Sequence, residues 1–159
     1  MQPLTPNQRA FLDMIAWSEI GPALLAESQN GYNVIVGSTP EHPILFDSYT
    51  DHPNRLIRLP NGIESTAAGR YQLLYRWWVP YKRQLKLPDF SPASQDAVAI
   101  QQIRERGALE LIDGGAINEA IAHCSNIWAS LPGNTYGQHE NAAAALRQAY
   151  AAAGGAFTA

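Results

Sequence analysis

The sequence predicts a single α+β domain, dominated by helices, with a small antiparallel sheet that forms one lobe. Apolar side chains recur at helical spacing near both ends of the chain. The stretch between residues 32 and 66 has short β-branched and aromatic runs separated by turn-forming residues. No linker, internal repeat or block of charge interrupts the 159 residues. We therefore expect one domain over residues 1–159, with a ligand-binding cleft between the helical lobe and the sheet lobe.

The first helix is predicted to run from about Pro6 to Glu19. Thr5 suits the N-cap, Pro6 suits the first helical position, and Gln8 completes a capping box. Gly21 and Pro22 follow after Ile20, and neither residue favours continuation of a helix.

The sheet lobe is expected after an irregular segment at residues 22–30. Single strands are predicted at residues 32–36 and 44–50, and a hairpin is predicted from residues 55–59 and 63–66 around Pro60-Asn61-Gly62. Further helices are expected at residues 71–85, with a kink or shift at Pro80, and at 92–106, 109–112, 117–124 and 140–152, with one helical turn at 127–131.

Glu19 is the first candidate for chemistry. It follows Ile15 by four residues, so it lies on the apolar face that Phe11, Met14 and Ile15 form. Partial burial disfavours a charged carboxylate, and we expect a raised pKa. A carboxylic acid that is protonated near neutral pH can act as a general acid on a glycosidic bond. The competing interpretation is a Glu that turns out to water, as charged residues mostly do.

Two further segments have the composition of a sugar-binding surface. Residues 65–72 lead from a predicted strand through small residues into a predicted helix, whose first turn carries Gln72. Its amide can donate and accept hydrogen bonds, although an ordinary turn with a solvated Gln72 explains the pattern equally well. Residues 126–138 combine amides, hydroxyls and aromatic rings, including Trp128 and Tyr136. Of the pair Trp77 and Trp78, we expect Trp78 to be structural.

Composition excludes several classes of protein. With 11 Lys and Arg against 14 Asp and Glu, the net charge of −3 argues against nucleic acid as the main partner. No run approaches the roughly 20 apolar residues of a membrane span, and no secretory signal is recognisable at the N-terminus. The four His residues have no metal-ligand spacing, and no Gly-x-Ser-x-Gly elbow is present. We expect no metal and no cofactor, and a buried structural thiol at Cys124, the single cysteine.

A glycosidase normally needs a second carboxylate. No Asp or Glu occurs in residues 28–40. The nearest candidates are Glu27, Glu41, Asp47, Asp51 and Glu64, and of these Asp47, Asp51 and Glu64 are considered further. Nothing in their spacing requires any of them to reach Glu19. One carboxyl suffices if a hydroxyl of the substrate attacks the anomeric carbon, because the same Glu can then donate a proton and accept one back.

The chain resembles the bacteriophage lambda endolysin family, also called lambda lysozymes, which are soluble lytic transglycosylases. The resemblance covers about residues 8–155. It rests on several strings in order: Ala10-Phe11-Leu12-Asp13-Met14 with Ala16-Trp17-Ser18-Glu19; Gly31-Tyr32 with Val34-Ile35-Val36-Gly37; Gly69-Arg70-Tyr71-Gln72-Leu73-Leu74; Arg76-Trp77-Trp78; Asp89-Phe90-Ser91-Pro92 with Ser94-Gln95-Asp96-Ala97-Val98-Ala99; and Cys124-Ser125-Asn126-Ile127-Trp128-Ala129-Ser130-Leu131-Pro132-Gly133.

The resemblance implies a lysozyme-like fold that cuts the β-1,4 bond between N-acetylmuramic acid and N-acetylglucosamine in peptidoglycan and leaves 1,6-anhydro-muramic ends. It implies that Glu19 is the catalytic acid and base. It also implies that Gln72 lies beside that Glu, and that Tyr136 and residues 126–132 belong to the wall of the cleft. Together with the composition of residues 65–72 and 126–138, this leads us to expect substrate binding by Ser65, Tyr71, Gln72, Asn126, Trp128, Ser130, Tyr136 and Gln138. We expect a monomer that is made in the host cytoplasm and reaches the periplasmic murein through a holin-formed lesion, without inserting stably into the membrane.

The chain departs from the family pattern at a few positions. Asn33 replaces an Asp, Glu64 replaces a Lys, and residues 40–44 resemble an insertion. Glu64 leaves open a hydrolytic activity or a changed affinity for the anionic wall. Two alternatives therefore stand beside the transglycosylase: a true muramidase that uses Glu19 with Asp47, Asp51 or Glu64, and a murein-binding module without catalytic activity.

Overall fold

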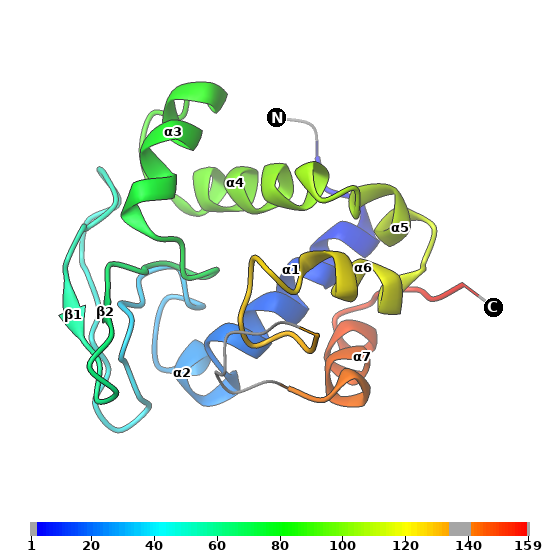
Figure 1. Ribbon diagram of the computed structural model, residues 1–159, viewed down its shortest axis with the longest axis horizontal. Coiled ribbons are helices and arrows are strands. Elements are labelled where there is room, and N and C mark those ends of the chain that lie inside the picture. The colour runs from blue at the N-terminus through cyan, green and yellow to red at the C-terminus, as the bar shows by residue number, and fades with distance from the viewer. Residues whose placement is uncertain (1–2, 134–140, 159) are drawn as a thin grey trace. The chain divides into compact units, whose positions relative to one another are not determined.

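Helices make up most of the regular structure in the computed structural model, which describes residues 3–133 and 141–158 (Figure 1). The chain forms two compact units. We call Met1–Glu19 with Ala99–Ala159 the terminal unit and Ile20–Val98 the central unit. The single domain over residues 1–159 stays a prediction. Within the described part of the chain, every helix is too short or too polar to cross a membrane.

The terminal unit is organised around α1 (Pro6–Glu19), which ends where it was predicted to end. The capping box is formed as expected. The backbone N–H of Gln8 donates to Thr5 Oγ1 over 3.1 Å, and the backbone N–H of Thr5 donates to Gln8 Oε1 over 3.2 Å. Six apolar residues of α1 are buried: Ala10, Phe11, Leu12, Met14, Ile15 and Ala16. Burial of this run holds the helix in the core of the unit.

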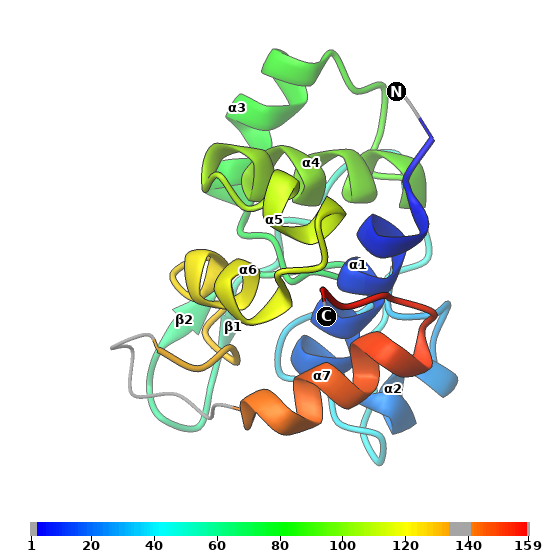
Figure 2. The same ribbon diagram turned by 90° about the vertical axis from the view of Figure 1, so that its right-hand side faces the viewer.

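Three shorter helices lie in the terminal unit beside α1. α5 (Leu109–Asp113) and α7 (Ala143–Ala152) pack against α1, and α6 (Ile117–Cys124) packs against both of them (Figures 1 and 2). The prediction for α6 is confirmed at both ends, and α5 is one residue longer than expected. The helical turn predicted at residues 127–131 is wrong: this segment forms turns, with the Leu131 N–H bonded to the Trp128 carbonyl over 3.0 Å.

The central unit contains the predicted hairpin, in a shorter form. β1 (Ile57–Arg58) pairs antiparallel with β2 (Glu64–Ser65), and Ile57 lies opposite Ser65. The irregular segment predicted after α1 is wrong, because α2 (Pro22–Ala26) forms there.

Regular strands at residues 32–36 and 44–50 were also expected, and this expectation is wrong. Only isolated bridges form there, from Val34 to Leu45 and from Ile35 to Ala68. Gly37, at a φ of 85°, turns the backbone out of the extended conformation directly after this run. The Ser38 hydroxyl then bonds both the N–H and the carbonyl of Ile44, which replaces ladder hydrogen bonds.

α3 (Tyr75–Leu85) begins four residues later than predicted, and it runs through Pro80 to its predicted end. The reason for the late start is a turn at residues 69–72, where Gly69 has a φ of 86° and Gln72 a φ of 51°. A left-handed residue cannot belong to a right-handed helix. α4 (Pro92–Glu105) follows Ser91 as expected, and its residues are divided between the two units.

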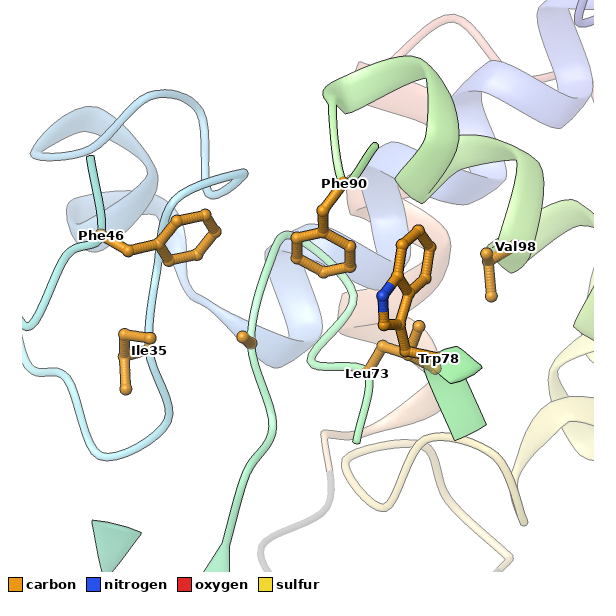
Figure 3. Close-up of a cluster of buried hydrophobic side chains, with 7 residues drawn as sticks. Ile35, Phe46, Leu73, Trp78, Phe90 and Val98 are labelled. Carbon is orange, nitrogen blue, oxygen red and sulfur yellow. The ribbon is translucent and has the colours of Figure 1, made fainter. Parts of the chain in front are cut away.

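A cluster of aromatic rings forms the core of the central unit (Figure 3). The Phe90 ring lies between Phe46, at 6.1 Å, and Trp78, which meets it edge to face at 4.9 Å. Trp78 is 1% exposed and Trp77 is 50% exposed, so the structural role predicted for Trp78 is confirmed. The Trp78 indole N–H donates to Asp51 Oδ1 over 2.7 Å, which satisfies its one polar group.

Gly69→Ala is expected to destabilise the protein by about 2 kcal/mol, because it combines backbone strain with a steric clash. The Gln95 amide fills the space that a Cβ at residue 69 would need. That amide accepts from the Arg70 N–H over 2.9 Å and donates to the Tyr32 and Phe90 carbonyls. Gly62→Ala is the matched control, since Gly62 has a φ of 85° and nothing within 4 Å of the added methyl. Urea denaturation of both variants measures the difference, and equal losses would contradict the role given to Gln95.

Candidate active site

Glu19 is the last residue of α1, and its side chain is partly buried. Burial raises the pKa of its carboxyl from 4.5 to about 7, while a hydrogen bond with the Ser130 hydroxyl acts in the opposite direction. The raised pKa predicted from the apolar face of the helix is therefore confirmed. Near neutral pH, this carboxyl is present in both its acid and its base form.

Ser130 is held close to α1 by its neighbours in the turns after α6. Trp128 and Leu131 are buried, with 3% and 0% of their surfaces exposed. The Ser130 hydroxyl lies 2.7 Å from the Ser18 hydroxyl. The backbone carbonyl of Ser130 accepts from the backbone N–H of Asn141 over 2.8 Å. The Asn141 side-chain amide donates to Ser18 Oγ over 2.9 Å. Glu19 therefore lies beside a connected set of three polar side chains.

The other residues of the segment 126–138 that were predicted to bind substrate differ in their exposure. Asn126 is exposed in the turn after α6, and Trp128 is buried. Tyr136 and Gln138 lie outside the described residues. Contact of these residues with substrate stays a prediction, as it does for Ser130.

Ser65, Tyr71 and Gln72 belong to the central unit. Ser65 Oγ accepts from the Ala67 N–H over 3.1 Å. Gln72 is not in the first turn of α3, as was expected, and this prediction is wrong because its left-handed backbone places it in the preceding turn. Its amide nitrogen donates to the Gly69 carbonyl over 2.8 Å, with a longer contact of 3.4 Å to the Val34 carbonyl.

Tyr71 is buried in a network of polar side chains. Its hydroxyl donates to Asp96 Oδ1 over 2.5 Å and accepts from Arg70 Nη1 over 3.1 Å. Burial and the negative charge of Asp96 raise the pKa of Tyr71 well above its usual value. The Tyr32 hydroxyl donates to the same oxygen of Asp96 over 2.9 Å. This network fixes the turn that carries Gln72 and gives Tyr71 a structural role.

The candidate second carboxylates differ in their surroundings. Asp51 accepts from the Trp78 indole and the His52 N–H, and its Oδ1 lies 3.4 Å from Lys82 Nζ. Burial by itself would raise the pKa of Asp51, but these three contacts lower it below its usual value. All three carboxylates, Asp47, Asp51 and Glu64, are exposed, and Asp51 is the one with these contacts. The contacts of Asp51 are those of a carboxylate that stabilises the central core.

The remaining chemical candidates are structural. Cys124 is buried, and burial raises the pKa of its thiol to about 12, so the predicted structural thiol is confirmed. No three His, Cys, Asp or Glu side chains within the described ranges are grouped in a way that could hold a metal ion.

Two residues of the site were missed from the sequence. Ser18 directly precedes Glu19, so its proximity could have suggested a role. Asn141 is separated from Ser18 by 123 residues, and no spacing or motif connects them.

Comparisons with known proteins show which family the chain is similar to. A sequence profile described as Endolysin matches residues 9–157. The endolysin of Escherichia phage lambda is 54% identical over 156 residues, which cover 98% of this chain and 96% of the relative. The endolysin of Escherichia phage P2 is 52% identical over 155 residues, which cover 94% and 93% of the two chains.

Solved structures show the same similarity. Bacteriophage lambda lysozyme in complex with a chitohexasaccharide superposes with a TM-score of 0.92 at 52% sequence identity. The superposition covers 99% of this chain and 100% of that one. A second structure of lysozyme from bacteriophage lambda gives a TM-score of 0.87 at 50% identity, over 99% of this chain and 100% of that one. The predicted α+β, lysozyme-like fold is thus confirmed.

Proposed function

The chain belongs to the endolysin family, and on that premise we propose that it is a phage endolysin that cleaves peptidoglycan as a lytic transglycosylase. It breaks the β-1,4 bond between N-acetylmuramic acid and N-acetylglucosamine and leaves 1,6-anhydro-muramic ends. A glycan strand as substrate is supported by the related lysozyme that was solved with a chitohexasaccharide.

The observation that carries this proposal is the carboxyl of Glu19, whose pKa burial raises to about 7. A general acid works best when its pKa lies near the operating pH, and so does a general base. A group that must serve first as one and then as the other therefore needs both forms accessible at the same pH. Glu19 meets that requirement.

In the proposed reaction, protonated Glu19 donates its proton to the glycosidic oxygen as the bond to the anomeric carbon breaks. The departing N-acetylglucosamine end retains that proton as a hydroxyl. The C6 hydroxyl of the muramic residue then bonds to the anomeric carbon and gives its proton to the Glu19 carboxylate. Glu19 is thereby protonated again, no water is consumed, and no second carboxylate takes part.

We propose that Ser65, Gln72, Asn126, Trp128, Ser130, Tyr136 and Gln138 contribute to binding of the glycan, with Tyr71 supporting the turn beneath Gln72. The amide nitrogen of Gln72 is bonded within its own turn, and its amide oxygen has no hydrogen bond within residues 3–133 and 141–158. That oxygen can accept a hydrogen bond from a sugar hydroxyl or amide. The proposal also includes action as a monomer, after holin-dependent access to the murein.

Mass spectrometry of the soluble fragments released from purified sacculi tests the proposed reaction. We expect fragments that end in anhydro-muramic acid, each one water lighter than the reducing form. Reducing muramic ends would show that water is the nucleophile and would favour the muramidase, with Asp47, Asp51 or Glu64 as the second carboxylate. Binding to sacculi without any released fragment would identify a murein-binding module.

A further inference from the structure

A series of hydrogen bonds leads from Asn141, two residues before α7, to Glu19. The Asn141 amide donates to Ser18 Oγ over 2.9 Å, with a longer contact of 3.4 Å to the Ser18 carbonyl. Ser18 Oγ lies 2.7 Å from Ser130 Oγ, and the Ser130 hydroxyl bonds the Glu19 carboxyl. Three side chains are therefore connected in series, and the last one bonds the reacting group.

The chemistry of the two ends sets the direction of this chain when Glu19 is ionised. The amide nitrogen of Asn141 can only donate, and a carboxylate can only accept. The Ser130 hydroxyl must then give its proton to Glu19, so its oxygen accepts the proton of Ser18. Ser18 in turn accepts from Asn141. Each hydroxyl donates toward Glu19, and such aligned hydrogen bonds polarise one another.

Protonation of Glu19 weakens this arrangement, because its remaining acceptor oxygen is neutral and its O–H can instead donate to Ser130. If the carboxylic acid donates to Ser130, the Ser130 proton turns toward Ser18, whose oxygen already accepts from Asn141. The proton of Ser18 then has no acceptor among Asn141, Ser130 and Glu19. The arrangement therefore favours the carboxylate and opposes the effect of burial.

We propose that Ser18 and Asn141 are positioning residues for Glu19, which hold the Ser130 hydroxyl with its proton directed at the carboxylate. The inference rests on the proposed function, in which Glu19 must exist as a carboxylate between its two proton transfers. Asn141 is itself held in place, because its backbone N–H donates to the Ser130 carbonyl over 2.8 Å. This backbone bond joins residues 130 and 141 directly.

Two charged groups on neighbouring elements, Asp113 and Arg147, have other partners. Asp113 of α5 accepts from Thr5 and Gln8, and Arg147 of α7 donates to Asn118 and lies over the Phe157 ring. The other titratable groups on these elements are Arg9 and Asp13 of α1, Glu110 of α5, Glu119, His123 and Cys124 of α6, and Tyr150 of α7. The pKa of Glu19 is set by its burial first and by the Ser130 hydroxyl second.

The test is a titration of the Glu19 side-chain carboxyl by carbon-13 NMR, without substrate, in Ser18→Ala, Asn141→Leu and Ser130→Ala variants. We expect Ser18→Ala and Asn141→Leu each to raise the titration midpoint by roughly 0.3 pH unit, against about 1 pH unit for Ser130→Ala. Ser18→Ala should add nothing in the Ser130→Ala background, because Ser18 acts through Ser130. Ser18→Thr retains the hydroxyl and should restore the wild-type midpoint.

Ser125→Ala is the matched control, since its hydroxyl donates to the Ala122 carbonyl over 3.0 Å and not to the chain that leads to Glu19. An unchanged midpoint in Ser18→Ala, or an equal shift with and without Ser130, would overturn the inference. Asn141→Leu tests the chain from its other end if Ser18→Ala does not fold. Because the titration needs no substrate, its outcome is independent of the product analysis that tests the transglycosylase.

Discussion

Glu19→Gln is expected to lower the release of soluble fragments from sacculi by about 10³-fold, because it removes the only proton donor and acceptor in the proposed reaction. Glutamine has nearly the same shape as glutamate, and its amide oxygen can still accept a hydrogen bond from Ser130. The fold should therefore be retained. The measurement is the initial rate of fragment release at pH 7, with circular dichroism to confirm that the variant is folded.

Glu41→Gln is the matched control for this experiment, since Glu41 is an exposed loop residue of the central unit. Its rate should equal that of the unmodified protein. A Glu19→Gln variant that is folded and fully active would end the assignment of Glu19 as acid and base. Full activity in a Glu64→Gln variant, together with anhydro ends, would argue against the muramidase that uses Glu64.

The same substitution is expected to stabilise the protein at alkaline pH. In the folded state, burial raises the pKa of Glu19 from 4.5 to about 7. A carboxyl with a raised pKa binds its proton more tightly when folded, so its favourable contribution is complete below pH 4.5 and is lost as the pH rises to 7. A shift of this size corresponds to a loss of about 3 kcal/mol across that range.

Glutamine does not titrate, so Glu19→Gln should escape this loss. We expect the free energy of unfolding of Glu19→Gln, relative to the wild type, to be about 3 kcal/mol more favourable at pH 8 than at pH 4. Urea denaturation at both pH values measures it, with Glu41→Gln expected to follow the wild type. If the free energy of unfolding changes with pH in the same way in Glu19→Gln and in the wild type, then folding does not raise the pKa of Glu19. The expected gain indicates that the residue is retained for function at a cost in stability.

The local features of the fold were predictable because their signals lie within a few residues of one another. The capping box joins Thr5 to Gln8 across one turn of helix, and α1 and α6 end where they were predicted to end. The hairpin around Gly62 was predicted from its turn residues. The raised pKa of Glu19 was predicted from its spacing to Ile15, because that spacing places both residues on one face of α1.

The start of α3 was predicted wrongly, because the backbone conformation there depends on long-range packing. Tyr71, Leu74 and Trp78 have helical spacing, yet α3 begins only at Tyr75 because Gly69 and Gln72 adopt left-handed conformations. That turn is stabilised by Gln95 and by the contact of Tyr71 with Asp96, and both partners come from α4. No propensity at residues 69–72 encodes these partners.

The sequence by itself determined the helical frame and placed an acid at the end of its central helix, because a repeat of three or four residues defines a face of a helix. Only the tertiary structure decided what surrounds that acid. Ser130 lies 112 residues from Ser18, and Asn141 lies 123 residues from it. These side chains meet because α6 and α7 pack together and α7 packs on α1. The packing of distant segments depends on many small contacts, so no single spacing in the sequence predicts which side chains will meet.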